Sequence, residues 1–238
     1  LKNRHHWIFT GAVLEFPKIP DGSIVEVQSA EGAFMGFATI NSKTSICARI
    51  ISFDSGDPLE ALRKHIRSAI DLRERLINPA LTNAARLVNA EADQVPGLIV
   101  DRYGDVLVIQ VSTVGVEKLK PFFIETLKDL VNPRAIYEKS GGPARRKEGL
   151  ADHEGWLFGT CEEPIEIRED GRTFLINLSV SQKTGFFLDQ RAMRSLLTSL
   201  TKGRTVLDCF SYTGGFTLAA LAGGALACVV RLVAIRAG

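Results

Sequence analysis

The chain has 238 residues, 45% of them hydrophobic and 24% charged, which is typical of a globular protein with room for one large domain or two to three small ones. With 29 Lys and Arg against 27 Asp and Glu, the net charge of +2 does not by itself indicate a nucleic-acid-binding protein. The four cysteines include no C-x-x-C pair and the four histidines lack ligand spacing, so we expect no metal site.

The longest apolar run, 218–230, has 13 residues. A membrane-spanning helix needs about 20 residues, so this run is too short to be one. The first residues lead into no apolar segment of the kind that a signal peptide has. We therefore expect a cytoplasmic protein without a membrane partner.

Residues 1–56 are expected to form a small β-barrel. Three short runs of strand-forming residues occur at 24–27, 32–40 and 46–51. Turn signals separate them at Pro20-Asp21-Gly22 and at Asn41-Ser42-Lys43. Short strands at this spacing favour a barrel.

Residues 57–79 are expected to form a connecting helix with Asp57 as its N-cap and Pro58 in its first turn. Its end is expected near Asn78-Pro79. An apolar stripe runs along Leu59, Leu62, Ile66, Ile70 and Leu76, opposite a basic face of Arg63, Lys64, Arg67, Arg73 and Arg75. That face could contact a polyanion, but the nearby carboxylates favour a solvated surface.

Residues 80–178 are expected to form a central α+β domain. The pattern predicts strands at 85–89, 98–102, 106–111 and 135–138, and a helix at 116–131. A polar stretch at 140–149 reads as a loop, and 165–177 reads as a hairpin. Strands and a helix in this order indicate a small α+β domain.

Residues 179–238 begin with a segment, 182–191, in which polar and aromatic residues alternate before a helix at 192–200. Lys183 could meet a carboxylate, and Phe186 or Phe187 could stack on a base. The alternative is a helix entry with Asp189 as N-cap and both phenylalanines in the core. The residues alone leave both open.

A short buried-type strand, 205–208, then leads through Gly214-Gly215 into a helix at 216–222. Glycine lets backbone approach a ligand closely, and a helix N-terminus offers free N–H groups. This turn therefore indicates a cofactor site, although it could also be a close packing of strand and helix. It matches neither G-x-G-x-x-G nor G-x-x-x-x-G-K-[ST].

Two segments together, Q-K-T-G-F-F-L-D-Q-R at 182–191 and V-L-D-C-F-S-Y-T-G-G-F at 206–216, resemble the class I S-adenosylmethionine-dependent ribosomal RNA large-subunit (cytosine-C5) methyltransferases. Upstream motifs agree from about residue 5. They are H-W-I-F-T-G-A at 6–12, with His6 where proline is usual, R-L-V-N-A-E at 86–91, and V-P-G-L-I-V-D-R-Y-G at 95–104.

The resemblance implies a multidomain α/β and α+β protein: a PUA-like RNA-binding barrel (1–56, with its N-terminal strand expected to be missing), the connecting helix, the central domain, and an incomplete Rossmann-like methyltransferase domain (179–238). It implies S-adenosylmethionine as cofactor and methylation of cytosine C5 in 23S rRNA, after a cysteine thiolate adds to C6 of the extruded base. Ribosomal RNA is the implied partner, and a homodimer is allowed.

By the same resemblance, twelve residues would line the cofactor: Lys183, Thr184, Gly185, Phe187, Asp208, Phe210, Ser211, Tyr212, Thr213, Gly214, Gly215 and Phe216. The candidate RNA-binding residues are Arg4, His5, Trp7, Arg145, Arg146 and Lys147. Such charge runs are often only solvated, and phosphate contacts would make binding weaken with salt.

The sequence departs from the family after Gly224. The family continues into a second strand that ends in a ribose-binding carboxylate, whereas no Asp or Glu follows Asp208 here. The nucleophilic cysteine motif is absent, and we assign that role to neither Cys209 nor Cys228. We expect the tail to be a frameshifted or truncated reading, the chain to be inactive alone, and its cofactor affinity to be poor.

Two other classes stay open: a non-catalytic RNA-binding protein or fragment, which the missing cysteine motif favours for this polypeptide, and a nucleotide-dependent oxidoreductase, which fits the Q-K-T-G segment badly.

Overall fold

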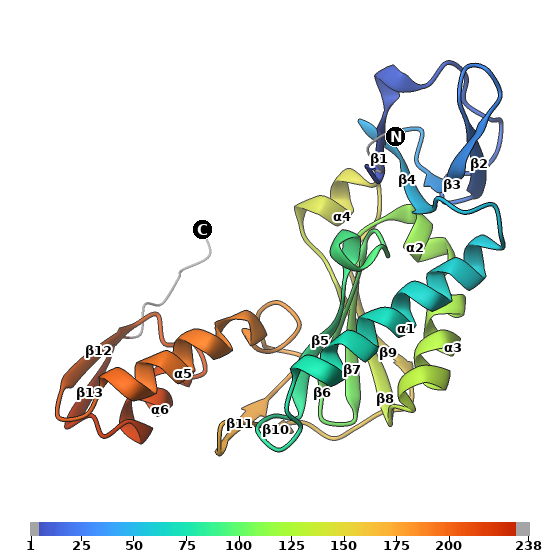
Figure 1. The fold of residues 1–238 in the computed structure, drawn as a ribbon. Coiled ribbons are helices and arrows are strands. Elements are labelled where there is room, and N and C mark those ends of the chain that lie inside the picture. Colours follow the sequence, from blue (N-terminus) through green and yellow to red (C-terminus); the bar gives the residue numbers. More distant parts are fainter. Residues whose placement is uncertain (1–4, 232–238) are drawn as a thin grey trace. The chain divides into compact units, whose positions relative to one another are not determined.

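The computed structural model describes residues 5–231 and divides into two compact units (Figure 1). The first unit comprises Leu1–Asn78 and Ala85–Glu162. The second comprises Pro79–Ala84 and Glu163–Gly238. Arg4, one of the RNA-binding candidates, lies outside the described residues.

The N-terminal part of the first unit is a four-stranded antiparallel sheet in the order β1-β4-β3-β2. Its core is Ile8, Ala38, Ile40, Cys47, Ala48 and Ile50. The strands expected near 24–27, 32–40 and 46–51 are confirmed. The elements are β1 (Trp7–Phe9), the 3-10 helix η1 (Thr10–Ala12), β2 (Ile24–Gln28), β3 (Phe34–Ile40) and β4 (Ile46–Ser52).

Helix α1 (Pro58–Leu76) begins as expected, because the Asp57 carboxylate accepts a hydrogen bond from the Leu59 amide at 2.8 Å. Leu62, Ile66 and Ile70 are buried along its inner face. The expectation that Leu76 completes this stripe is wrong. Leu76 is 73% exposed, because six residues after Ile70 it points about 120° away from the buried face, and Ile77 packs against the core instead.

The rest of the first unit is a five-stranded sheet in the order β5-β6-β7-β8-β9, with β7 and β8 parallel. Helices α1 and α3 lie along one face of it (Figure 1), and their apolar side chains share one core with the sheet. The bounds are β5 (Ala84–Asn89), the 3-10 helix η2 (Ala90–Asp93), β6 (Leu98–Tyr103), β7 (Val106–Val111), β8 (Ala135–Ser140) and β9 (His153–Phe158). Strand β9 was not predicted; it is an edge strand of exposed and partly exposed residues, in which three apolar residues follow His153-Glu154-Gly155.

The single helix expected at 116–131 is two helices, α2 (Val114–Lys118) and α3 (Lys120–Val131). Pro121 stands in the first turn of α3, where its missing N–H and its ring prevent α2 from continuing. The stretch 140–149, expected to be a loop, contains the short helix α4 (Pro143–Lys147). Gly142, at φ 99°, makes the turn that precedes it.

The second unit starts with the hairpin β10 (Ile165–Glu169) and β11 (Arg172–Ile176), which we expected within the central domain. It continues through the 3-10 helix η3 (Leu188–Gln190) and α5 (Arg191–Leu200) to β12 (Thr205–Cys209), α6 (Gly215–Ala222) and β13 (Ala227–Arg231). Strands β12 and β13 are parallel, with Cys209 opposite Arg231. The three-domain division stays a prediction.

Candidate functional site

The turn between β12 and α6 has an unusual backbone. Phe210, Tyr212 and Gly214 all have positive φ angles, of 66°, 49° and 74°. Two of the three are bulky residues, for which this conformation is strained and is often found at functional sites. A Cβ on Gly214 would meet no atom within 4 Å, so the space beside the turn is open.

Asp208 holds this turn against the helix. Its side chain is buried, and its Oδ2 accepts hydrogen bonds from the Thr217 amide at 3.1 Å and from Thr217 Oγ1 at 2.6 Å. The carboxylate therefore takes one of the free N–H groups at the start of α6. It also places a negative charge where the helix dipole stabilises it.

Tyr212 joins the two segments that the sequence singled out. Its hydroxyl accepts a hydrogen bond from the Gln182 amide at 2.8 Å and donates one to the Gly185 carbonyl oxygen at 3.1 Å. Its ring stands edge-on to Phe187, with centroids 5.3 Å apart. The structure therefore brings loop 182–187 and turn 208–216 together, although they are distant in sequence.

The two phenylalanines of loop 182–187 have different surroundings. Phe186 is buried and packs on Phe174 at 4.9 Å between ring centroids. Phe187 is only partly buried, and Lys183 Nζ lies 4.3 Å from its ring centroid. Lys183 Nζ is also 3.7 Å from a carboxylate oxygen of Asp189. Phe187, not Phe186, is thus available at the surface of the loop.

The alternative in which Asp189 caps the following helix is wrong. Asp189 lies inside η3, and α5 begins after Gln190 without a side-chain cap. The chain enters α5 through a 3-10 turn, in which the Gln190 amide donates to the Phe187 carbonyl oxygen at 3.1 Å.

The residues that the resemblance implies for the cofactor differ in their burial. Thr184, Gly185, Ser211 and Gly215 are buried, whereas Phe210, Tyr212 and Thr213 are exposed. Phe216 follows in the first turn of α6. The resemblance implied an acidic residue at the end of the second strand, whereas β13 ends in Arg231.

The RNA-binding candidates of the first unit fall into two groups. His5 and Trp7 lie at its surface, with ring centroids 5.6 Å apart, and the Trp7 indole N–H donates to Glu91 Oε1 at 3.4 Å. Arg146 and Lys147 are also exposed. Arg146 pairs with Asp152 at 2.5 Å, and this hydrogen bond lowers the pKa of the Asp152 carboxyl.

Arg145 does not present its charge at the surface. Its guanidinium is buried and donates to the carbonyl oxygens of Ala151 at 2.6 Å and Val111 at 2.8 Å, and to Glu117 Oε2 at 2.9 Å. With its donors held by Ala151, by β7 and by α2, this side chain cannot reach a phosphate while the unit is folded. The reading of Arg145 as an exposed loop cation is therefore corrected.

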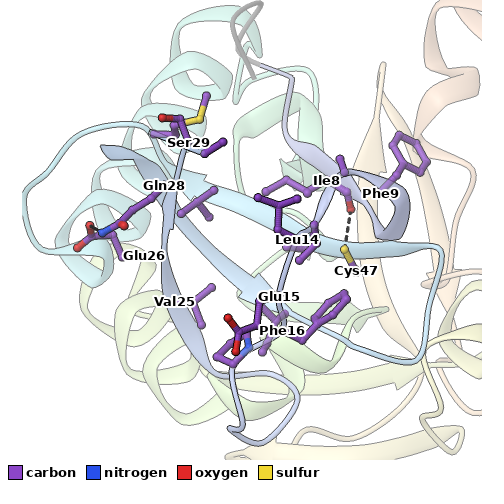
Figure 2. A pocket seen from close by; sticks show the side chains of 18 of the residues that line it. Ile8, Phe9, Leu14, Glu15, Phe16, Val25, Glu26, Gln28, Ser29 and Cys47 are labelled. Carbon is purple, nitrogen blue, oxygen red and sulfur yellow. Dashed lines mark hydrogen bonds between the residues drawn. The ribbon is translucent and has the colours of Figure 1, made fainter. Parts of the chain in front are cut away.

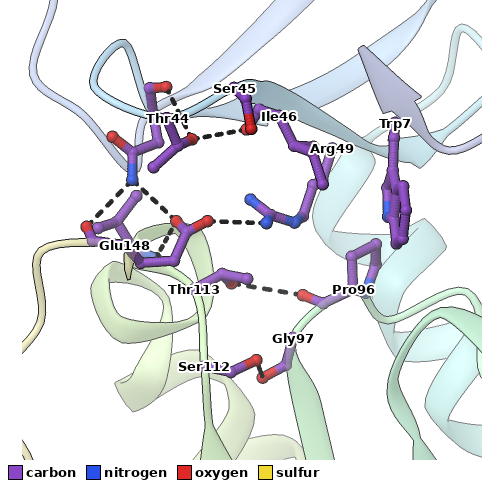
Figure 3. Close-up of polar contacts among 12 residues, drawn as sticks. Trp7, Thr44, Ser45, Ile46, Arg49, Pro96, Gly97, Ser112, Thr113 and Glu148 are labelled. Atoms are coloured by element: carbon purple, nitrogen blue, oxygen red, sulfur yellow. Dashed lines mark hydrogen bonds and ion pairs between the residues drawn. The ribbon is translucent and has the colours of Figure 1, made fainter. Parts of the chain in front are cut away.

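Two features of the first unit were missed from sequence. Buried Glu148, next to α4, accepts from Arg49 Nη2 at 2.7 Å and from Asn41 Nδ2 at 2.8 Å (Figure 3). It thereby ties β4 to the central sheet. Pairs this distant in sequence leave no local pattern.

The second missed feature is an open cavity of about 1130 Å³ in the four-stranded sheet (Figure 2). Its walls are largely apolar, and at its base Cys47 Sγ donates to the Ile8 carbonyl oxygen at 3.3 Å. Burial raises the pKa of the Cys47 thiol.

Residues 145–237 match the family of S-adenosylmethionine-dependent methyltransferases, and residues 1–53 match PUA-like domains. The chain therefore resembles S-adenosylmethionine-dependent methyltransferases over its C-terminal part and PUA-like domains over its N-terminal part. No helix within residues 5–231 is long and apolar enough to cross a membrane.

Curated relatives agree with these two matches. The ribosomal RNA large subunit methyltransferase I of Aeromonas salmonicida is 36% identical over 229 residues, which are 94% of this chain and 58% of the relative. That of Shewanella denitrificans is 37% identical with the same coverage. The chain thus spans somewhat more than half the length of these relatives.

Solved structures resemble it as well. A Streptococcus mutans protein assigned as a SAM-dependent methyltransferase is 26% identical, with a TM-score of 0.77 over 94% of this chain and 58% of its own. Another chain, assigned as a methyltransferase and solved with SAH (S-adenosylhomocysteine), is 25% identical, with a TM-score of 0.79 over 96% of this chain and 58% of its own.

Proposed function

We propose that the chain supplies the RNA-binding part and the first cofactor wall of an enzyme that methylates cytosine C5 in 23S rRNA. The observation that carries the cofactor role is the double hydrogen bond of Tyr212 to Gln182 and Gly185. It holds together the two segments whose residues resemble the family's cofactor motifs. S-adenosylmethionine would supply the methyl group, and the names of the relatives support ribosomal RNA as substrate.

The residues of this chain would bind and orient that cofactor. Lys183 and Phe187 offer a cation and an aromatic face on one side of the site, and Tyr212 lies beside them. The first N–H groups of α6 offer donors on the other side, because a helix start leaves them without intrahelical acceptors. Positive φ angles at Phe210 and Tyr212 support a shaped, preorganised turn.

The chain alone is proposed to be inactive. The nucleophile that would add to C6 has no motif in these 238 residues, and no carboxylate follows Asp208 to accept bonds from the ribose hydroxyls. Both groups would have to come from another polypeptide segment. RNA contact is proposed for His5, Trp7, Arg146 and Lys147, which lie at the surface of the first unit, whereas Arg145 is removed from that set.

A chimera tests the chemistry. The segment of the Aeromonas salmonicida relative that matches this chain is replaced by this chain up to Gly224, and radiolabelled methyl transfer to 23S rRNA is measured. We expect transfer to C5 of a cytosine by the chimera and none by the chain alone. Transfer to another atom, or none by a folded chimera that binds the rRNA, would contradict the proposal.

A second candidate is a non-catalytic RNA-binding protein, which the missing carboxylate and nucleophile favour for this polypeptide. Filter binding to 23S rRNA at increasing salt tests the RNA role that both candidates share. Specific shifts of the Gly214 and Gly215 amides on addition of S-adenosylhomocysteine would separate the two, since only the methyltransferase role needs a cofactor wall. A cytoplasmic location and a homodimer stay predictions.

A further inference from the structure

Arg194 is the most unusual buried side chain of the second unit. It lies on α5, is 2% exposed, and is one of the largest fully buried side chains in the described part of the chain. Its Nε donates to Glu169 Oε1 at 2.6 Å, and its Nη2 donates to Glu169 Oε2 at 2.8 Å. This bidentate pair ties α5 to the end of β10.

The same guanidinium reaches both segments of the candidate cofactor wall. Its Nη1 donates to the Phe187 carbonyl oxygen at 3.1 Å, and its plane lies over the Phe186 ring at 4.5 Å from the centroid. Its stem packs against the start of α6, where a Cβ on Gly215 would come within 3.1 Å of Arg194 Cδ. One side chain thus touches β10, loop 182–187 and the N-terminus of α6.

We propose that Arg194 is a positioning residue that fixes loop 182–187 relative to the N-terminus of α6. It thereby sets the distance between the two segments that would contact the cofactor. This inference rests on the proposed cofactor role of these segments. A buried ion pair is weak as a source of stability, because desolvation of two charges offsets their attraction. The guanidinium of Arg194 has a role that an apolar side chain could not fill, because its planar arrangement of donors binds a carboxylate and a carbonyl oxygen at the same time.

Arg172 offers a matched control. It also joins the hairpin to α5, because its Nη1 donates to Thr198 Oγ1 at 3.1 Å and its Nη2 donates to Asp170 Oδ2 at 3.2 Å. None of these contacts involves loop 182–187 or α6. Arg194→Lys and Arg172→Lys therefore both weaken the link between hairpin and α5, but only the first removes the guanidinium hydrogen bond to the Phe187 carbonyl oxygen, which keeps its bond from the Gln190 amide.

The first measurement is hydrogen exchange of the chain without cofactor, corrected for any change in global stability. Arg194→Lys should speed exchange in 185–190 and 215–218 by about tenfold, the effect of losing one hydrogen bond from a charged donor. Arg172→Lys should change these segments by less than about twofold, since their hydrogen bonds stay intact. Equal exchange in the two variants would overturn the proposal.

If Arg194→Lys does not fold, the double variant Glu169→Gln/Arg194→Met replaces it. It removes both buried charges and leaves an amide oxygen for Arg191, which lies 3.3 Å from Glu169 Oε2. It should fold and still show the fast exchange of loop 182–187. Slow exchange in this variant would equally overturn the proposal.

The second measurement is an NMR titration with S-adenosylhomocysteine. Ligand shifts at Gly214 and Gly215 should shrink severalfold in Arg194→Lys and persist in Arg172→Lys. Undiminished shifts in Arg194→Lys would overturn the positioning role. If the unaltered chain shows no shifts at all, the cofactor role fails instead, and the exchange data still decide whether Arg194 holds the loop.

Discussion

The Tyr212 hydroxyl lies 3.1 Å from the Gly185 carbonyl oxygen, to which it donates, and 2.8 Å from the Gln182 amide nitrogen, from which it accepts. Tyr212→Phe removes both hydrogen bonds while keeping the ring against Phe187. We expect the Gln182 amide to exchange about fivefold faster, because a net hydrogen bond contributes about 1 kcal/mol. NMR hydrogen exchange measures this. The Gln190 amide, which donates to the Phe187 carbonyl oxygen, serves as internal control; equal acceleration at both amides would mean general loosening.

Asp208→Ala should destabilise the second unit by about 1 kcal/mol, the usual loss when a helix N-terminus loses its side-chain acceptor. Thr217 would lose both of its hydrogen bonds to the carboxylate. Urea denaturation checks this value. Asp189→Ala is the control, since Asp189 is exposed and caps no helix. An equal loss in that variant would contradict the assigned role of Asp208.

Glu148→Ala should destabilise the first unit by about 3 kcal/mol, because it leaves the largely buried Arg49 guanidinium without its carboxylate and removes one of the two hydrogen bonds that buried Asn41 donates to Glu148. Arg63→Ala removes an ion pair with Asp129 in which both partners are exposed, and should change stability by less than about 1 kcal/mol. Chemical denaturation of both variants gives the comparison. Similar small losses would mean that Glu148 does not tie β4 to the central sheet.

The pH dependence of stability should include a contribution from Glu117. Burial raises the pKa of this carboxyl, but hydrogen bonds from Lys120 and Arg145 outweigh burial and hold the pKa below its ordinary value of 4.5. A pKa that is lower in the folded chain gives stability that is present above pH 4.5 and is lost as the pH falls through the lowered value. The free energy of unfolding of Glu117→Gln, measured from pH 7 downward, should therefore fall less steeply in this window than that of the unaltered chain. Parallel curves would contradict the assignment.

Local signals predicted most elements of the fold. Asp57-Pro58 starts α1 and the turn at Glu169–Arg172 closes the hairpin, because caps and turns depend on neighbouring residues. Pro121 signals the break before α3, but the apolar period of 116–131 continues across it and predicted a single helix. Gly142 signals the start of α4, but the polar run around it predicted a loop. Edge strand β9 lacks the alternation that marks a strand.

The candidate site was predictable in its residues but not in its contacts. The resemblance selected loop 182–187 and turn 208–216, yet no sequence pattern shows that Tyr212 joins them or that Arg194 lies beneath both. The burial of Arg145 could not be predicted from its neighbours either, because it depends on Val111 and Glu117, which are distant in the chain. Long-range partners of charged groups follow from packing alone.

A titration of the unaltered chain with S-adenosylmethionine tests the central claim most directly. Followed at the amides of Gly185, Gly214 and Gly215, it reports both where the ligand binds and how tightly. Because the chain supplies only part of the cofactor site and lacks a carboxylate for the ribose hydroxyls, we expect chemical-shift changes confined to these segments. We also expect a dissociation constant that is millimolar or weaker. Micromolar binding, or shifts located elsewhere in the chain, would contradict the account.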